Sequence, residues 1–232
     1  MLLVGQKTPK NQVFVFDGKG RKFKTIMLEK LIEGLTSHTK WACMDFNSEE
    51  DLVLVTADGR LFVVDLMNGE VRDKQVFAAF NDLQNQVEEA KLEQNTLVLR
   101  TKANKFFYAQ NVVQGALQAC QLHKMASSRR LETGASGGDW LDFVVKVKSE
   151  GGRKTVRVLC TDPVDGVHVV QEDFTKHHCE AELRSGDLGQ RFGKVKFIAY
   201  NSRKDWVALY ANAELSGSVI VVEDSLEREI NR

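Results

Sequence analysis

The sequence has little proline, no long apolar run and no net charge. Two prolines in 232 residues, together with 43% hydrophobic residues, argue against disorder and favour a packed core. The 32 basic and 32 acidic residues balance, so no global field draws the chain toward nucleic acid or anionic lipid. No apolar run approaches the roughly 18 residues of a membrane-spanning helix. The first residues lack the charged flank and the length of a signal sequence.

Cysteine is also sparse, and the cysteines are widely spaced. The four cysteines are Cys43, Cys120, Cys160 and Cys179, and no two of them form a short-spaced pair. Three lie in or beside apolar runs. Without a signal sequence, this pattern predicts reduced, mostly buried thiols in a cytosolic protein.

Residues 41–65 carry the clearest structural pattern. A short strand at 43–46 is followed by a continuous apolar run at 52–56, a turn at 57–60 and a returning run at 61–64. The Asp-Gly pair in this turn predicts a type I′ hairpin, with positive φ at both central residues. The inner strands are apolar on both faces, which favours a sheet stacked between two others, as in a propeller blade.

The pattern returns near the end of the chain. Residues 200–209 align with residues 46–55, because both have an aromatic strand end, an Asn-Ser-x-x-Asp corner and an apolar run. Asn and Ser side chains can cap such a turned backbone. The two units are about 150 residues apart, or three to four repeats of the ~40–50 residues typical of propellers.

The rest of the chain is consistent with further antiparallel meanders. A second Asp-Gly hairpin is predicted between residues 13–16 and 23–28. Residues 77–87 fit a short helix or a packed loop between sheets. We predict additional strands at 71–76, 87–92, 96–100, 106–109, 116–122, 140–148, 155–161, 166–171, 179–183 and within 194–223. The predicted fold is all-β: a partial WD40-like β-propeller of about four to five blades, in one domain over residues 1–232.

One sequence motif could indicate hydrolase chemistry. Residues 134–138 satisfy G-x-S-x-G, with Ser136 as the nominal nucleophile and Gly134 and Gly138 at its ends. That motif needs a strand before the serine and a helix after it. Here a polar loop precedes it and a β-rich run follows, so we interpret it as a loop.

Other clusters are equally weak as functional sites. His177, His178 and Cys179 with Cys160 could suggest zinc, but consecutive side chains of an extended chain point to opposite faces. Residues 18–22 lack the context of a phosphate-binding loop and fit a solvated hairpin tip. The adjacent acidic pairs at 49–50 and 88–89 and the Arg129-Arg130 pair fit solvated corners and loops. We predict no catalytic residue, no cofactor and no metal, and therefore not an enzyme; the partner-binding residues are unknown.

Several short signatures, in the same order and at similar spacing, resemble the N-terminal region of the vacuolar protein sorting-associated protein 16 family. They lie at residues 13–20, 41–65, 83–87, 109–112 and 206–210 and extend over nearly the whole chain. Members of this family are core subunits of the endolysosomal tethering complexes HOPS and CORVET. The resemblance implies a propeller scaffold that associates with other tethering subunits, in the cytoplasm and peripherally on late endosome, lysosome or vacuole membranes.

This chain departs from the family pattern because it has no helical solenoid, the region that docks the Sec/Munc-type subunit. That contact is therefore not expected here, and no binding to nucleic acid is expected. The chain could be a fragment or a natural short form. Two alternatives remain open: a propeller adaptor of a coat or ubiquitin-ligase assembly, and an enzyme that uses the Gly134–Gly138 loop.

Overall fold

The computed structural model describes residues 2–6, 11–16, 19–46, 51–80, 82, 85–112, 121–124, 142–150, 153–162, 166–173, 178–182, 194–201, 206–213 and 216–222. These residues form five antiparallel sheets. Each sheet is a meander in which successive strands of the chain are neighbours. This confirms the predicted all-β propeller fold, at five sheets.

The strands follow one another without crossovers. The first sheet contains β1 (Leu2–Gln6), β2 (Gln12–Phe16) and β3 (Lys22–Met27), followed by the short helix α1 (Leu28–Leu31). The second contains β4 (Trp41–Phe46), β5 (Asp51–Thr56), β6 (Arg60–Asp65) and β7 (Glu70–Val76), followed by the 3₁₀ helix η1 (Ala78–Phe80). The third contains β8 (Val87–Glu93), β9 (Thr96–Thr101), β10 (Phe106–Gln110) and β11 (Leu122–Lys124).

The last two sheets are built in the same way. The fourth contains β12 (Asp142–Glu150), β13 (Arg153–Asp162), β14 (Gly166–Asp173) and β15 (His178–Glu182). The fifth contains β16 (Lys194–Asn201), β17 (Trp206–Ala213) and β18 (Ser216–Val222).

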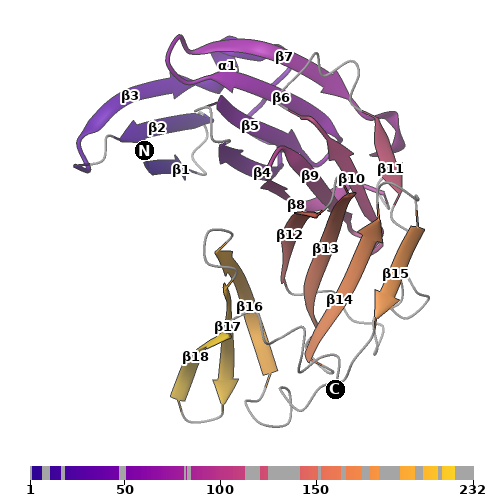
Figure 1. Cartoon of the computed structure of the whole chain (residues 1–232). Coiled ribbons are helices and arrows are strands. Elements are labelled where there is room, and N and C mark those ends of the chain that lie inside the picture. Colours follow the sequence, from indigo (N-terminus) through magenta and orange to yellow (C-terminus); the bar gives the residue numbers. More distant parts are fainter. Residues whose placement is uncertain are drawn as a thin grey trace.

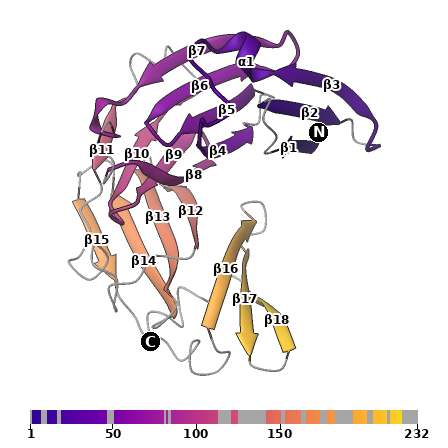
Figure 2. The same cartoon turned by 180° about the vertical axis from the view of Figure 1, so that it is seen from behind.

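The five sheets are arranged along an arc, as the two opposite views in Figures 1 and 2 show. The first strand of each sheet lies on the inner side of the arc, where β4 contacts β8, β8 contacts β12, and β12 contacts β16. In both views the first and fifth sheets stand at the two ends of the arc with a gap between them. The described residues therefore form an open rather than a closed ring.

Apolar clusters between neighbouring sheets hold the arc together. One cluster joins the first and second sheets through residues such as Val13, Val15 and Leu54. Another joins the second and third sheets and includes Phe77 and Phe80 from the connection between them. Every residue of β5 and of β9 is buried, because each of these strands has a sheet on both sides. This confirms that the inner strands of residues 41–65 are covered on both faces.

The hairpin at residues 57–60 forms, but the predicted turn type is wrong. Gly59 has a φ of +82°, whereas Asp58 is not among the residues with positive φ. The Gly59 N–H donates to the Thr56 carbonyl over 3.0 Å, which closes a three-residue loop that ends in a left-handed glycine. The Thr56 hydroxyl accepts the Arg60 N–H at 3.0 Å and thereby fixes the longer loop.

The internal repeat occupies equivalent places in two sheets. Residues 46–55 connect β4 to β5 in the second sheet, and residues 200–209 connect β16 to β17 in the fifth. The two sheets are three positions apart in the arc, within the predicted separation. The predicted fourth strand at 116–122 falls largely outside the described residues, and the strand that pairs with β10 there is β11. No prediction anticipated α1.

Candidate interaction surface

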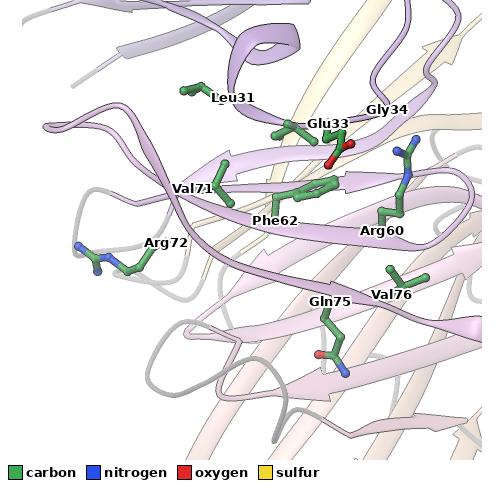
Figure 3. Close-up of a pocket in the computed structure, with 10 residues that line it drawn as sticks. Leu31, Glu33, Gly34, Arg60, Phe62, Val71, Arg72, Gln75 and Val76 are labelled. Carbon is green, nitrogen blue, oxygen red and sulfur yellow. The ribbon is translucent and has the colours of Figure 1, made fainter.

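A groove of about 790 Å³ lies on the second sheet, beside its outermost strand β7. Its lining comes from three segments: the end of α1 with the residues after it, the start of β6, and β7. Phe62 forms a buried apolar floor, with the half-buried Leu31 and Val71 beside it (Figure 3). At one end, Val76 is 63% exposed although it is a large apolar residue. The groove therefore has a buried apolar floor and an exposed apolar side chain at one end.

Charged side chains stand at the rim of this groove. Arg60 reaches toward the segment after α1, where Glu33 and Gly34 are exposed (Figure 3). Arg60 also pairs with Asp58 at 3.0 Å, so part of its charge is already compensated. An apolar floor with a mixed polar rim suits a protein segment better than a strongly charged ligand.

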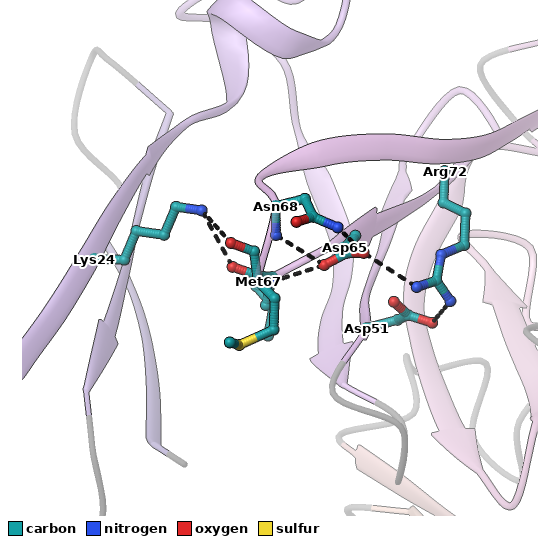
Figure 4. Close-up of polar contacts among 7 residues, drawn as sticks. Lys24, Asp51, Asp65, Met67, Asn68 and Arg72 are labelled. Atoms are coloured by element: carbon teal, nitrogen blue, oxygen red, sulfur yellow. Dashed lines mark hydrogen bonds and ion pairs between the residues drawn. The ribbon is translucent and has the colours of Figure 1, made fainter.

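A polar network beside the groove fixes the turn between β6 and β7 (Figure 4). Asp65 accepts the backbone N–H groups of Met67 and Asn68 at 2.8 and 3.0 Å. Arg72 joins Asp65 to Asp51, at 3.1 and 2.8 Å. These contacts hold β7, and with it one wall of the groove, in place.

The same turn is also fastened to the first sheet. Lys24 on β3 donates to the carbonyl oxygen of Met67 at 2.7 Å and to that of Leu66 at 3.4 Å (Figure 4). A hydrogen bond from an ammonium group is charge-assisted and therefore stronger than one between two neutral groups. The first and second sheets are therefore joined by a polar contact as well as by their apolar cluster.

The network makes stability depend on pH through Asp65. The hydrogen bond from the Asn68 N–H, with those from Arg72 and Met67, lowers the pKa of Asp65 below its ordinary value of 3.8. A carboxyl with a lowered folded-state pKa stabilises the fold above its unfolded pKa, and this contribution is lost as pH falls through the folded value. We expect the urea concentration at the unfolding midpoint to decrease as the pH is lowered below about 4. In Asp65→Asn this decrease with pH should be less steep. Equal slopes in the two proteins would contradict this role.

Cys43 on β4 is a free thiol in the cluster between the second and third sheets. Burial, with a smaller contribution from the charge of Asp45, raises its pKa to about 12. The reactive thiolate is therefore scarce at neutral pH. We expect iodoacetamide to leave Cys43 unmodified at pH 8 in the folded protein and to alkylate it in urea, as measured by peptide mass spectrometry. Alkylation within minutes without urea would contradict this burial.

The structure places the sequence candidates as follows. The Gly134–Gly138 loop, Arg129-Arg130, His177 and the Glu49-Glu50 pair lie outside the described residues. His178 and Cys179 begin β15, and Cys160 lies in β13. Glu89 pairs with Lys91 and Arg100 rather than with another carboxylate, while Glu88 is exposed. Within the described ranges, no three His, Cys, Asp or Glu side chains are grouped so that they could hold a metal ion, and no helix is long and apolar enough to cross a membrane.

The groove itself was not anticipated. Its lining joins residues 31–34, 60–62 and 71–76, which are adjacent only after the second sheet has folded against α1. The sequence feature that could have indicated the groove is Val76, an apolar residue at the end of a strand rich in charged residues.

Comparisons with known proteins support the fold. No protein-family model matches the sequence, and no curated protein matches it. Among solved structures, the chain is similar to the β-propeller domain of Cps50 (Swd1) from Myceliophteria thermophila, with a TM-score of 0.50 and 10% identity over 97% of this chain and 69% of that one. The chain therefore has the fold of a β-propeller domain. At 10% identity, this similarity supports the fold and no statement about function.

Proposed function

We propose that the chain is a non-enzymatic scaffold module of a membrane-tethering complex of the HOPS or CORVET type. It would act in vesicle transport and fusion at late endosomes, lysosomes or vacuoles. The propeller fold supports the scaffold half of this proposal. The step to tethering rests on the likeness of residues 13–20, 41–65 and 206–210 to the vacuolar protein sorting-associated protein 16 family.

The observation that best supports a scaffold function is that the inner strands are fully buried, whereas the outer groove is accessible to a partner. The strands β5 and β9 are buried on both faces, so their residues serve sheet stacking. What this part of the molecule presents to a partner is the outer groove, with the exposed Val76 at one end. We infer that another subunit of the complex places an apolar segment there, against Phe62 and Val71.

We infer the proposed membrane location from the other subunits of the complex and not from any lipid attraction of this chain. The formal net charge is zero, so the chain as a whole supplies no attraction to anionic lipid. The chain would therefore reach late endosome, lysosome or vacuole membranes from the cytoplasm, peripherally and through the other subunits.

The test is affinity purification of the tagged full chain from cells of its source, with quantitative mass spectrometry. We expect tethering-complex subunits to be recovered with the unmodified chain. Val76→Asp places a charge in the groove and should reduce their recovery about tenfold. Met67→Asp is the matched control, because Met67 is a similarly exposed apolar residue, at 60%, that does not line the groove.

Two results would each overturn one part of the proposal, the first the tethering role and the second the groove as the contact. Recovery of a coat or ubiquitin-ligase assembly would assign the propeller to the alternative class of adaptor. Equal recovery with all three proteins would leave the tethering role in place but remove the groove as the contact.

A further inference from the structure

The turn between β6 and β7 contains the only Asn-Gly pair in the sequence, Asn68-Gly69. An asparagine before a glycine is prone to deamidation, because glycine has no Cβ to hinder attack by its own backbone nitrogen. Asn68 is also exposed, so water reaches its side-chain amide. The turn therefore presents a group that can be modified without an enzyme.

Deamidation at this pair takes two steps and needs only water. The Gly69 nitrogen loses its proton to solvent and forms a bond to Cγ of Asn68, while the bond from Cγ to Nδ2 breaks and ammonia leaves. Water then opens the resulting succinimide ring at either carbonyl, which gives aspartate or isoaspartate at position 68. The net change is hydrolysis of an amide to a carboxylate and ammonium, with no oxidation. The first step requires a free Gly69 N–H and a Cγ that can approach the Gly69 nitrogen.

In the folded turn, Asp65 holds both reacting groups. The Gly69 N–H donates to the Asp65 carbonyl oxygen at 2.7 Å. The Asn68 Nδ2 donates to Oδ2 of Asp65 at 2.9 Å, and the Asn68 N–H donates to Oδ1 at 3.0 Å (Figure 4). A hydrogen-bonded amide gives up its proton to water only when the bond opens. The folded turn therefore withholds both the attacking nitrogen and the carbon that it must reach.

Contacts from two strands hold this turn closed. Arg72 on β7 pairs with the Asp65 carboxylate at 3.1 Å. Lys24 on β3 donates to the Met67 carbonyl oxygen at 2.7 Å and to that of Leu66 at 3.4 Å. Both cations make charge-assisted bonds, which are stronger than those between neutral groups. Opening the turn therefore requires that contacts with β7 and with the first sheet be broken.

We propose that Asn68 is a deamidation site that the closed turn protects and that reacts when the turn between β6 and β7 opens. Such an opening is local and does not require global unfolding. When opening and closing are faster than the chemical step, the rate follows the population of the open turn. The modification therefore accumulates in chains whose turn opens often. This inference concerns the turn itself and does not depend on the tethering role.

The product of the reaction keeps the turn from closing again. A carboxylate at position 68 has no side-chain N–H to donate to Asp65, and it places a second negative charge beside that carboxylate. Isoaspartate also lengthens the backbone by one methylene, which displaces the Gly69 N–H from the Asp65 carbonyl. Since β7 follows this turn and lines the groove, deamidation loosens one wall of the groove.

The rates of deamidation in the folded and the unfolded chain test the proposal. The purified full chain is kept at pH 8 in native buffer, and a second sample is kept in guanidinium chloride. Mass spectrometry of the peptides that contain position 68 measures the fraction in which the amide has become a carboxylate. We expect deamidation in native buffer to be slower by about tenfold or more, because the bonds of both Asn68 and Gly69 must open first. Equal rates in the two samples, or no deamidation in guanidinium chloride, would overturn the proposal.

Lys24→Ala separates the opening of the turn from the reactivity of the pair. The variant removes the bonds to the Met67 and Leu66 carbonyls and leaves the Asn-Gly pair unchanged. We expect deamidation in native buffer to become several-fold faster, and the rate in guanidinium chloride to stay the same. Lys30→Ala, which removes an exposed lysine of α1 outside this network, should change neither rate. An unchanged native rate in Lys24→Ala would show that opening of the turn does not control the reaction and would overturn the proposal.

Two substitutions measure the effect of the product. Asn68→Asp and Asn68→Ala both remove the Nδ2 donor to Asp65, but only Asn68→Asp adds a charge beside it. We expect Asn68→Asp to unfold at a lower urea concentration than Asn68→Ala at pH 7. If both variants unfold at the same urea concentration, the added carboxylate does not keep the turn open, and that part of the proposal is wrong.

Discussion

Replacing Gly59 with alanine should destabilise the protein by about 2–4 kcal/mol, of which left-handed backbone strain supplies ~1–2 and overpacking the rest. Gly59 has a φ of +82°. A Cβ added there would lie 2.7 Å from Cδ2 of Phe80 and 3.0 Å from the carbonyl oxygen of Phe77. The backbone cannot withdraw easily, because the Gly59 carbonyl also accepts the Phe77 N–H at 3.0 Å.

Gly20 is the matched control for this substitution. Its φ is +76°, but a Cβ there would meet nothing within 4 Å. Gly20→Ala should therefore cost only the backbone term, about 1 kcal/mol. Urea unfolding followed by tryptophan fluorescence measures both variants. Equal losses would show that steric contact with Phe80 contributes nothing.

The physical reason for this sensitivity is the position of Phe80. Its ring meets those of Phe77 and Phe107 edge to face, at centroid distances of 6.3 and 5.2 Å. It is fully buried in the cluster that joins the second and third sheets. A displaced Phe80 therefore loosens a sheet-to-sheet interface, and Phe80→Leu should reduce the additional cost of Gly59→Ala.

Sequence reasoning located this hairpin correctly but not its turn. Asp-Gly between apolar runs is a local signal, and strands formed on both sides of it. The loop length was decided by the Thr56 side chain, which binds the backbone of Arg60 and adds a residue to the loop. Periodicity in the sequence does not contain that contact.

The groove could not be predicted from sequence periodicity either. Helix α1 has only four residues, too few for any helical period to show, yet it supplies one wall of the groove. The strands were predictable because each meander is local in sequence and strongly apolar. The groove was not, because its three segments meet only through pairing and stacking of the second sheet.

Replacing Arg72 with alanine should destabilise the protein by about 2–3 kcal/mol. The Arg72 guanidinium pairs with Asp51 at 2.8 Å, and the Asp51 side chain is only 2% exposed. Removing one partner of a buried pair costs ~3–5 kcal/mol where the remaining charge has no other partner; Asp51 has a further interaction, which lowers that cost. Arg72 itself is 52% exposed, so water can enter where it stood and reduce that cost.

Two further variants show whether the carboxylate is the cause. Arg60→Ala removes an arginine whose partner Asp58 is 50% exposed, and should cost under about 1 kcal/mol, as surface pairs do. Adding Asp51→Asn to Arg72→Ala should restore about 1 kcal/mol, because a neutral amide is cheaper to bury than a carboxylate that has lost its arginine. If the double variant were no more stable than Arg72→Ala, the loss would come from the packing of the arginine stem and from Asp65. Arg72 would then hold the wall of the groove by its shape rather than by its charge.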